Sequence, residues 1–148
     1  MLTTLALFVS VLIAPAAAEP LGRDLDGRVV VIEQALAKTA LVFWSMDCTE
    51  CTQQLRALER AGVRVVGINT DAASSAGRLR AFVHTSGFDS PMIADPSGDL
   101  QEQFQLQEGV VVLDEQGGFE ARISDFASVE DAFQAAGCIH PSTIASQH

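Results

Sequence analysis

The stretch that decides the fold is Leu41-Val-Phe-Trp-Ser-Met-Asp-Cys-Thr-Glu-Cys-Thr-Gln-Gln-Leu55. Its first residues form an apolar run typical of a buried strand. Its last residues begin a helix pattern in which Cys51, Leu55 and Leu58 share one face. Cys48 and Cys51 therefore lie where a strand is followed by a helix. The first turn of a helix offers unpaired N–H groups and the positive end of the helix dipole, and both favour a reactive thiolate. This context predicts dithiol chemistry.

The chain begins with the features of a secretory signal peptide. Residues 5–14 are apolar and are followed by small residues that a signal peptidase accepts. We expect cleavage after Ala18, which leaves residues 19–148 as one domain with a short tail from about residue 137. An uncleaved membrane anchor is the alternative, because residues 1–18 carry no charged side chain. We expect the domain outside the cytoplasm, periplasmic or secreted, with no stable membrane span after cleavage.

The net charge and the number of cysteines reduce the range of functions that the sequence allows. A formal net charge of −10 argues against nucleic acids and anionic membrane surfaces as partners. The three cysteines cannot all pair within one chain, so pairing of Cys48 with Cys51 leaves Cys138 over. A disulfide stabilises a protein mainly by closing a long loop, and a loop of this length is too short for that. Function therefore explains the cysteine pair better than stability does.

The remainder of the mature chain alternates between strand patterns and helix patterns. The strands are expected at residues 29–32, 40–44, 63–68, 91–94, 110–113 and 119–123. The helices are expected at residues 33–37, at 48–61, from a Ser74 or Ser75 cap to Gly87, at 99–105, and after a Ser128 cap with Asp131 at the capping-box position. Strand–helix–strand units followed by a hairpin and a helix predict an α/β fold with a mixed sheet covered on both faces.

Several segments resemble one known family. Phe43-Trp-Ser-Met-Asp-Cys-Thr-Glu-Cys51 resembles the active-site segment of the thioredoxin superfamily. The N-terminal turn Leu25-Asp-Gly27, the helical insertion at residues 69–88, and the turns Asp95-Pro-Ser-Gly98 and Leu113-Asp-Glu-Gln-Gly117 are similar to its exported TlpA/ResA-like branch. The resemblance covers about residues 20–136 and implies a thioredoxin-like three-layer sandwich.

The resemblance also implies an activity, which is thiol–disulfide exchange on protein thiols and disulfides with an upstream thiol reductant. Cys48 would be the attacking thiolate and Cys51 the resolving cysteine. The redox-active disulfide between them would be the reactive group, with no metal or organic cofactor. Trp44 would pack beside the loop. Asp71 is a candidate proton shuttle for Cys51, although capping a helix or facing solvent are the alternatives.

Two acidic residues depart from the family pattern. Asp47 directly precedes the nucleophile, where the family usually has Trp, and Glu50 replaces a proline often found between the cysteines. Negative charges beside Cys48 disfavour a thiolate and should raise the pKa of that thiol. They destabilise the reduced form, so we expect a weakly oxidising disulfide in a reductant-like protein.

The family's cis-proline is also missing from this sequence. The segment from Phe104 to Asp114 contains no proline, and Gly109 or Glu108 occupies the approximate position in the partner-binding groove. A cis bond without proline costs about 2.5–4 kcal/mol, so we expect a trans peptide. The alternatives to an oxidoreductase are a catalytically weak thioredoxin-fold binding or metal-binding module, and a peroxiredoxin-like peroxidase.

Overall fold

The strand that precedes the cysteines is the centre of the sheet. The computed structural model describes residues 20–32, 37–72 and 75–135, and in it this strand is β3 (Thr39–Trp44), with all six residues buried. β3 pairs in parallel with β4 (Arg64–Asn69) and antiparallel with β6 (Gly109–Leu113). A strand buried on both faces favours apolar residues, which explains the apolar run from Ala40 to Trp44 after Thr39.

Two shorter pairings complete the sheet. β5 (Met92–Ala94) runs parallel to β4, and β7 (Phe119–Ile123) runs antiparallel to β6. The strand order is β5-β4-β3-β6-β7. The sheet is therefore mixed, as the sequence predicted.

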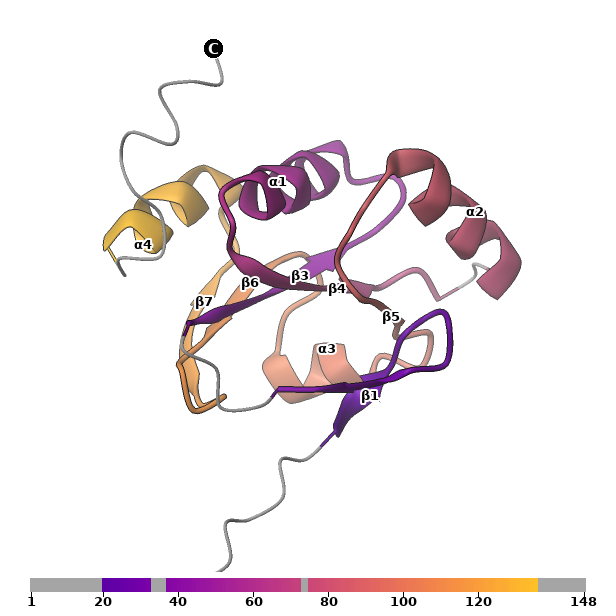
Figure 1. Ribbon diagram of the computed structural model, residues 1–148, viewed down its shortest axis with the longest axis horizontal. Helices are drawn as coiled ribbons and strands as arrows, with labels where there is room; N and C mark the ends of the chain where they lie inside the picture. Colours follow the sequence, from indigo (N-terminus) through magenta and orange to yellow (C-terminus); the bar gives the residue numbers. More distant parts are fainter. Residues whose placement is uncertain (1–19, 33–36, 73–74, 136–148) are drawn as a thin grey trace, which may run out of the picture.

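Each face of the sheet is covered (Figure 1). On one face lie α1 (Thr49–Arg60), α2 (Ala76–Ser86) and α4 (Val129–Ala135). On the other lie α3 (Asp99–Phe104) and a hairpin of β1 (Pro20–Arg23) and β2 (Val29–Val31). The predicted three-layer thioredoxin-like arrangement, with its N-terminal hairpin and its helical insertion, is confirmed.

The two faces of β3 contribute to separate cores because neighbouring residues of a strand point in opposite directions. Val42 and Trp44 pack in the core under α1, together with Cys51. Leu41 and Phe43 pack in the core on the side of α3 and the hairpin. The helix that begins at the cysteines is thus anchored to the central strand by a fully buried face.

The predicted ends of α2 are confirmed, and so is the start of the last helix directly after Ser128, but the capping role predicted for Ser128 is wrong. Ser75 is the N-cap of α2 and Gly87 ends it in the left-handed conformation. Before α4, however, residues Phe126–Ser128 form a short 3-10 turn capped by Asp125, whose carboxylate accepts the Ala127 N–H at 3.0 Å. Ser128 donates its hydroxyl to the same carboxylate instead of capping a helix. Asp125 caps better because a carboxylate accepts several hydrogen bonds at once.

Some predictions lie outside the described residues. These are the signal peptide, most of the short helix expected at residues 33–37, and the tail that contains Cys138. Among the residues that are described, no helix combines the length and the apolar character needed to cross a membrane.

Candidate active site

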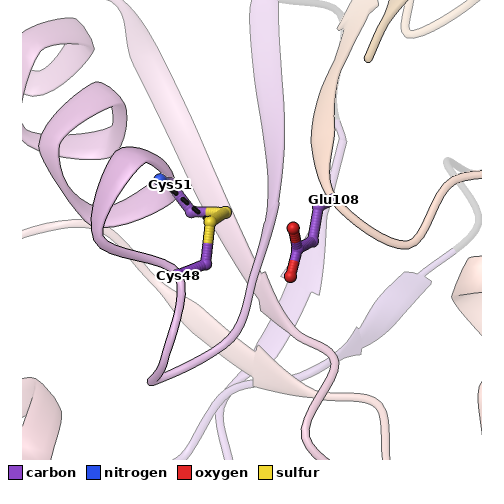
Figure 2. Close-up of side chains that lie close together, drawn as sticks. All are labelled: Cys48, Cys51 and Glu108. Atoms are coloured by element: carbon purple, nitrogen blue, oxygen red, sulfur yellow. Dashed lines mark hydrogen bonds between the residues drawn. A yellow bond between two sulfur atoms is a disulfide. The ribbon is translucent and has the colours of Figure 1, made fainter. Parts of the chain in front are cut away.

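Cys48 and Cys51 form a disulfide at the start of α1 (Figure 2). Cys48 is the N-cap residue of this helix, with φ −86° and ψ 92°, and its Sγ accepts the backbone N–H of Cys51 at 3.1 Å. The two Cα atoms are 5.3 Å apart, which is an ordinary disulfide separation. After reduction, the same N–H group and the helix dipole would stabilise negative charge on the Cys48 sulfur.

The two cysteines differ in exposure. Cys51 is 0% exposed and packs in the same core as Leu55, whereas Cys48 is partly exposed at the edge of that core. Cys48 is therefore the more accessible residue of the pair, and the sulfur of Cys51 is covered by the protein. This asymmetry fits an attacking Cys48 and a resolving Cys51.

Trp44 lies in the core that holds Cys51. It is fully buried, its ring stacks on Phe82 with the centroids 5.7 Å apart, and Phe88 contacts it edge-on with the centroids 5.9 Å apart. Its backbone C=O accepts the N–H of Thr70 at 2.9 Å, which ties the end of β3 to the end of β4. Trp44 thus helps to fix the strand end from which the cysteine loop begins.

Asp71 holds the loop that leads to Cys48. Its Oδ2 accepts the backbone N–H of Met46 at 2.9 Å and the side-chain N–H of Asn69 at 2.8 Å. Asn69 is buried, and its Oδ1 accepts the N–H of Asp71 in return. These bonds connect β4 to the loop two residues before Cys48, so Asp71 positions that loop.

The side chain of Glu108 faces the disulfide from the side opposite to helix α1 (Figure 2). The antiparallel register pairs Gly109 with Phe43, so Glu108 lies near the end of β3, where the cysteine loop begins. A carboxylate oxygen of Glu108 and the sulfurs of Cys48 and Cys51 all lie within 4.8 Å of one another. The hydroxyl of Ser45 donates to Glu108 Oε1 at 3.3 Å. Of Glu108 and Gly109, Glu108 is therefore the residue whose side chain faces the cysteines.

Gly109 has a different role from Glu108. Its φ is +135°, a conformation that side chains rarely adopt, and a Cβ atom there would collide with the backbone oxygen of Ile123. No cis peptide bond occurs in the described residues, which confirms the trans peptide expected between Glu108 and Gly109. Gly109 allows the chain to enter β6 directly after presenting Glu108.

The other two predicted acids are exposed. Asp47 lies in the turn before Cys48, and Glu50 lies in the first turn of α1, where the helix dipole favours an acidic side chain. The described structure thus gathers Cys48, Cys51 and Glu108 at one point, with Asp71 bracing their loop. The sequence did not reveal the bracing by Asn69 or the bond from Ser45, because both depend on tertiary contacts.

The chain shares its fold with solved structures that include a disulfide oxidoreductase and a thioredoxin-like protein. StoA from Bacillus subtilis is 20% identical, with 79% of this chain and 98% of that chain covered and a TM-score of 0.55. A secreted Mycobacterium tuberculosis disulfide oxidoreductase is 18% identical, with coverages of 77% and 93% and a TM-score of 0.60. A thioredoxin-like protein from Aeropyrum pernix is 17% identical, with coverages of 80% and 89% and a TM-score of 0.63. At these identities the likeness establishes the fold.

The family follows from the sequence match. No curated protein sequence matches the chain. Residues 13–118 match the AhpC/TSA family, and this stretch includes both cysteines of the disulfide, Asp71 and Glu108. The match and the thioredoxin-like neighbours agree with the resemblance found in the sequence. Since it covers well over half of the 148 residues, the chain belongs to the AhpC/TSA family.

Proposed function

We propose that the protein is a thiol–disulfide oxidoreductase that reduces protein disulfides outside the cytoplasm. The observation that carries the proposal is the asymmetric disulfide at the start of α1, in which residue Cys48 is partly exposed and Cys51 is 0% exposed. The family match supports it, and so does the secreted disulfide oxidoreductase that shares the fold.

The proposed reduction of a partner's disulfide takes place in two steps, one for each cysteine. The Cys48 thiolate attacks one sulfur of the partner's disulfide, and the partner's other sulfur leaves as a thiolate that takes up a proton. Cys51 then loses its proton and attacks the Cys48 sulfur, which releases the partner as a second thiol and closes the Cys48–Cys51 bond. Two electrons and two protons pass to the partner, and an upstream thiol reductant restores the dithiol. The exchange itself needs no metal or organic cofactor.

The acidic surroundings of the cysteines support the reducing direction. Glu108 lies within 4.8 Å of both sulfurs, and Asp47 and Glu50 are neighbours of the cysteines in the sequence. Negative charges at such distances oppose a thiolate, so they destabilise the reduced protein relative to the disulfide. A disulfide that is favoured in this way is a poor oxidant, and its dithiol is a good reductant.

Export is the second part of the proposal. The apolar segment at residues 5–14 with small residues up to Ala18 supports it, and so does the fold shared with a mycobacterial protein that is described as secreted. Mass spectrometry of the protein recovered from cell fractions tests this part. We expect a chain that begins at Glu19 outside the cytoplasm, and a full-length cytoplasmic chain would contradict export.

Insulin reduction with a thiol reductant as the electron source tests the activity. We expect turnover by the wild type and by Cys138→Ser, and loss of turnover in Cys48→Ser. The Cys138→Ser variant is the matched control, because it also removes one thiol but changes none of the residues assigned to the proposed site. Turnover that survives in Cys48→Ser would contradict the proposal. A protein that consumes hydrogen peroxide but does not reduce insulin would be a peroxidase, and one that does neither would be a binding module.

A further inference from the structure

We propose that the reduced protein binds one divalent metal ion of the zinc type through Cys48, Cys51 and Glu108. This site uses the same two thiols as the proposed function, but it does not depend on turnover. The three residues are the one group of cysteine, histidine and acidic side chains in the described residues whose ligand atoms come within 4.8 Å of one another.

The geometry suits a tetrahedral ion. Zinc lies about 2.3 Å from thiolate sulfur and about 2.0–2.2 Å from carboxylate oxygen, so two ligands of one tetrahedral zinc are about 3.5–3.8 Å apart. The sulfurs and the carboxylate oxygen already lie within 4.8 Å of one another. Figure 2 shows the Glu108 side chain pointing across to the disulfide from the loop before β6. Once the S–S bond is broken, rotations of these side chains would bring three ligands onto one ion.

The disulfide must be reduced before the ion can bind. Two electrons and two protons from a thiol reductant break the S–S bond and give two thiols, which can then move apart. The ion displaces one proton from each thiol and is held by two thiolates and one carboxylate. These three charges exceed the charge of a divalent ion by one. The fourth position of the tetrahedron is left for water.

Glu108 decides which class of ion the site takes. A dithiol alone suits soft ions such as Cu⁺, whereas a carboxylate oxygen adds a hard donor that favours a divalent ion. The hydroxyl of Ser45 donates to Glu108 Oε1 at 3.3 Å, which orients the carboxylate from outside the site. Glu108 is exposed, so the ion can bind without moving an uncompensated charge into the interior.

Metal binding and disulfide exchange exclude each other, because a coordinated thiolate cannot attack a partner. The ion binds only the reduced form of the protein, and it then blocks the sulfur of Cys48. The site would thus store the dithiol in a protected form that a chelator releases. Zinc should inhibit insulin reduction, and a chelator should restore it.

Cobalt titration of the Cys138→Ser protein, reduced with a phosphine, tests this site, because Co²⁺ reports thiolate ligation by its absorption and Zn²⁺ then displaces it. We expect one ion per chain and a thiolate-to-cobalt band in the reduced protein, and neither in the oxidised protein. Glu108→Gln should weaken Zn²⁺ binding by at least about tenfold. Glu102→Gln is the matched control, since Glu102 is exposed on α3 across the sheet from α1. Its affinity for Zn²⁺ should equal that of the parent protein.

Three results would overturn the metal site. These are equal Zn²⁺ affinity in Glu108→Gln and the parent, no binding by the reduced protein, and one ion shared by two chains. The insulin assay is read separately, without added metal. A failure there leaves the titration result standing, and a failure of the titration leaves the exchange activity standing.

Discussion

Cys48 and Cys51 are chemically alike in sequence and differ in the fold. The face of α1 that packs on the sheet contains Cys51, and the N-cap position puts Cys48 at the rim of the same core. One sulfur is therefore accessible and the other is covered. The residues around the two cysteines affect them either by holding the backbone in position or by their charge. Single substitutions can distinguish these two effects.

Asp71→Ala removes the acceptor that holds the Met46 N–H. We expect a loss of stability of about 1–2 kcal/mol, because a part-buried donor loses its partner, and a several-fold lower rate of insulin reduction from a loosened loop. Asp71→Asn keeps an acceptor oxygen and should restore most of both losses. Rates and urea unfolding of the two variants check this. A proton shuttle would give the opposite pattern, with normal stability and no rescue by Asn.

Gly109→Ala should destabilise the protein by about 1–3 kcal/mol, because the backbone φ of +135° does not suit a side chain and a Cβ would collide with Ile123. Gly77→Ala on α2 is the matched control, since its Cβ would meet nothing within 4 Å and alanine favours a helix. The control should be about 0.5–1 kcal/mol more stable than the parent. Unfolding followed by the fluorescence of Trp44, the single tryptophan, measures both. Equal stabilities for the two variants would contradict this account of Gly109.

At the scale of elements, the short helix α3 depends on one buried carboxylate. Asp95 is 4% exposed, and its oxygens accept the N–H groups of Leu100 at 3.1 Å and Gln101 at 3.0 Å. α3 spans six residues, too few for a stable isolated helix, so its start must be held from outside. Because α3 leads directly into the segment that presents Glu108, this capping also steadies one side of the site.

Asp95→Ala should lower the free energy of unfolding by about 1–2 kcal/mol, since two helix N–H groups lose their acceptor. Asp95→Asn retains one acceptor oxygen and should lose less. Ser97→Ala is the comparison in the same turn, because the Ser97 hydroxyl makes only an exposed bond to Asp99. Urea unfolding ranks the three variants. An alanine variant at position 95 as stable as the one at position 97 would show that the carboxylate does not hold α3.

Most elements could be predicted from the sequence because their patterns are local. The apolar run of β3, the Ser75 cap and the Gly87 stop of α2 each depend on a few neighbouring residues. The cap before α4 could not be predicted as readily, because Asp125 and Ser128 both offer capping oxygens and only the geometry shows that Asp125 caps a 3-10 turn ahead of the helix.

Only part of the candidate site could be predicted from the sequence, for a related reason. Cys48 and Cys51 could be identified from the residues next to them in the sequence. Glu108 reaches them only because the register of β6 against β3 puts Gly109 opposite Phe43, and an apolar run fits several registers equally well. The sequence therefore left open which of two residues meets the disulfide, and the pairing of the strands decides for Glu108.

At the scale of the whole molecule, the formal charge of −10 adds to the local acids around the disulfide. This charge favours basic or neutral partner surfaces and opposes a thiolate at the site. A partner disulfide flanked by lysine or arginine would approach the exposed Cys48 more readily than one flanked by acids.

The redox equilibrium with glutathione measures the effect of charge. We expect a disulfide that glutathione reduces poorly, and a shift of roughly two- to tenfold toward the reduced protein in Glu108→Gln, because the substitution removes the charge that opposes a thiolate. Glu102→Gln should give the parent equilibrium. A disulfide as oxidising as a strong disulfide donor, or a shift in the opposite direction, would refute the reducing role.

The central claim is that Cys48 attacks and Cys51 resolves. Peptide mass spectrometry of the Cys51→Ser protein after reaction with a model protein disulfide tests it most directly, because a mixed disulfide that cannot be resolved accumulates on the attacking sulfur. The account predicts a stable adduct on Cys48, and no adduct on Cys51 in the Cys48→Ser protein. An adduct on Cys51 of the Cys48→Ser protein would contradict it, and so would a Cys51→Ser protein that forms its adduct on Cys138 or forms none.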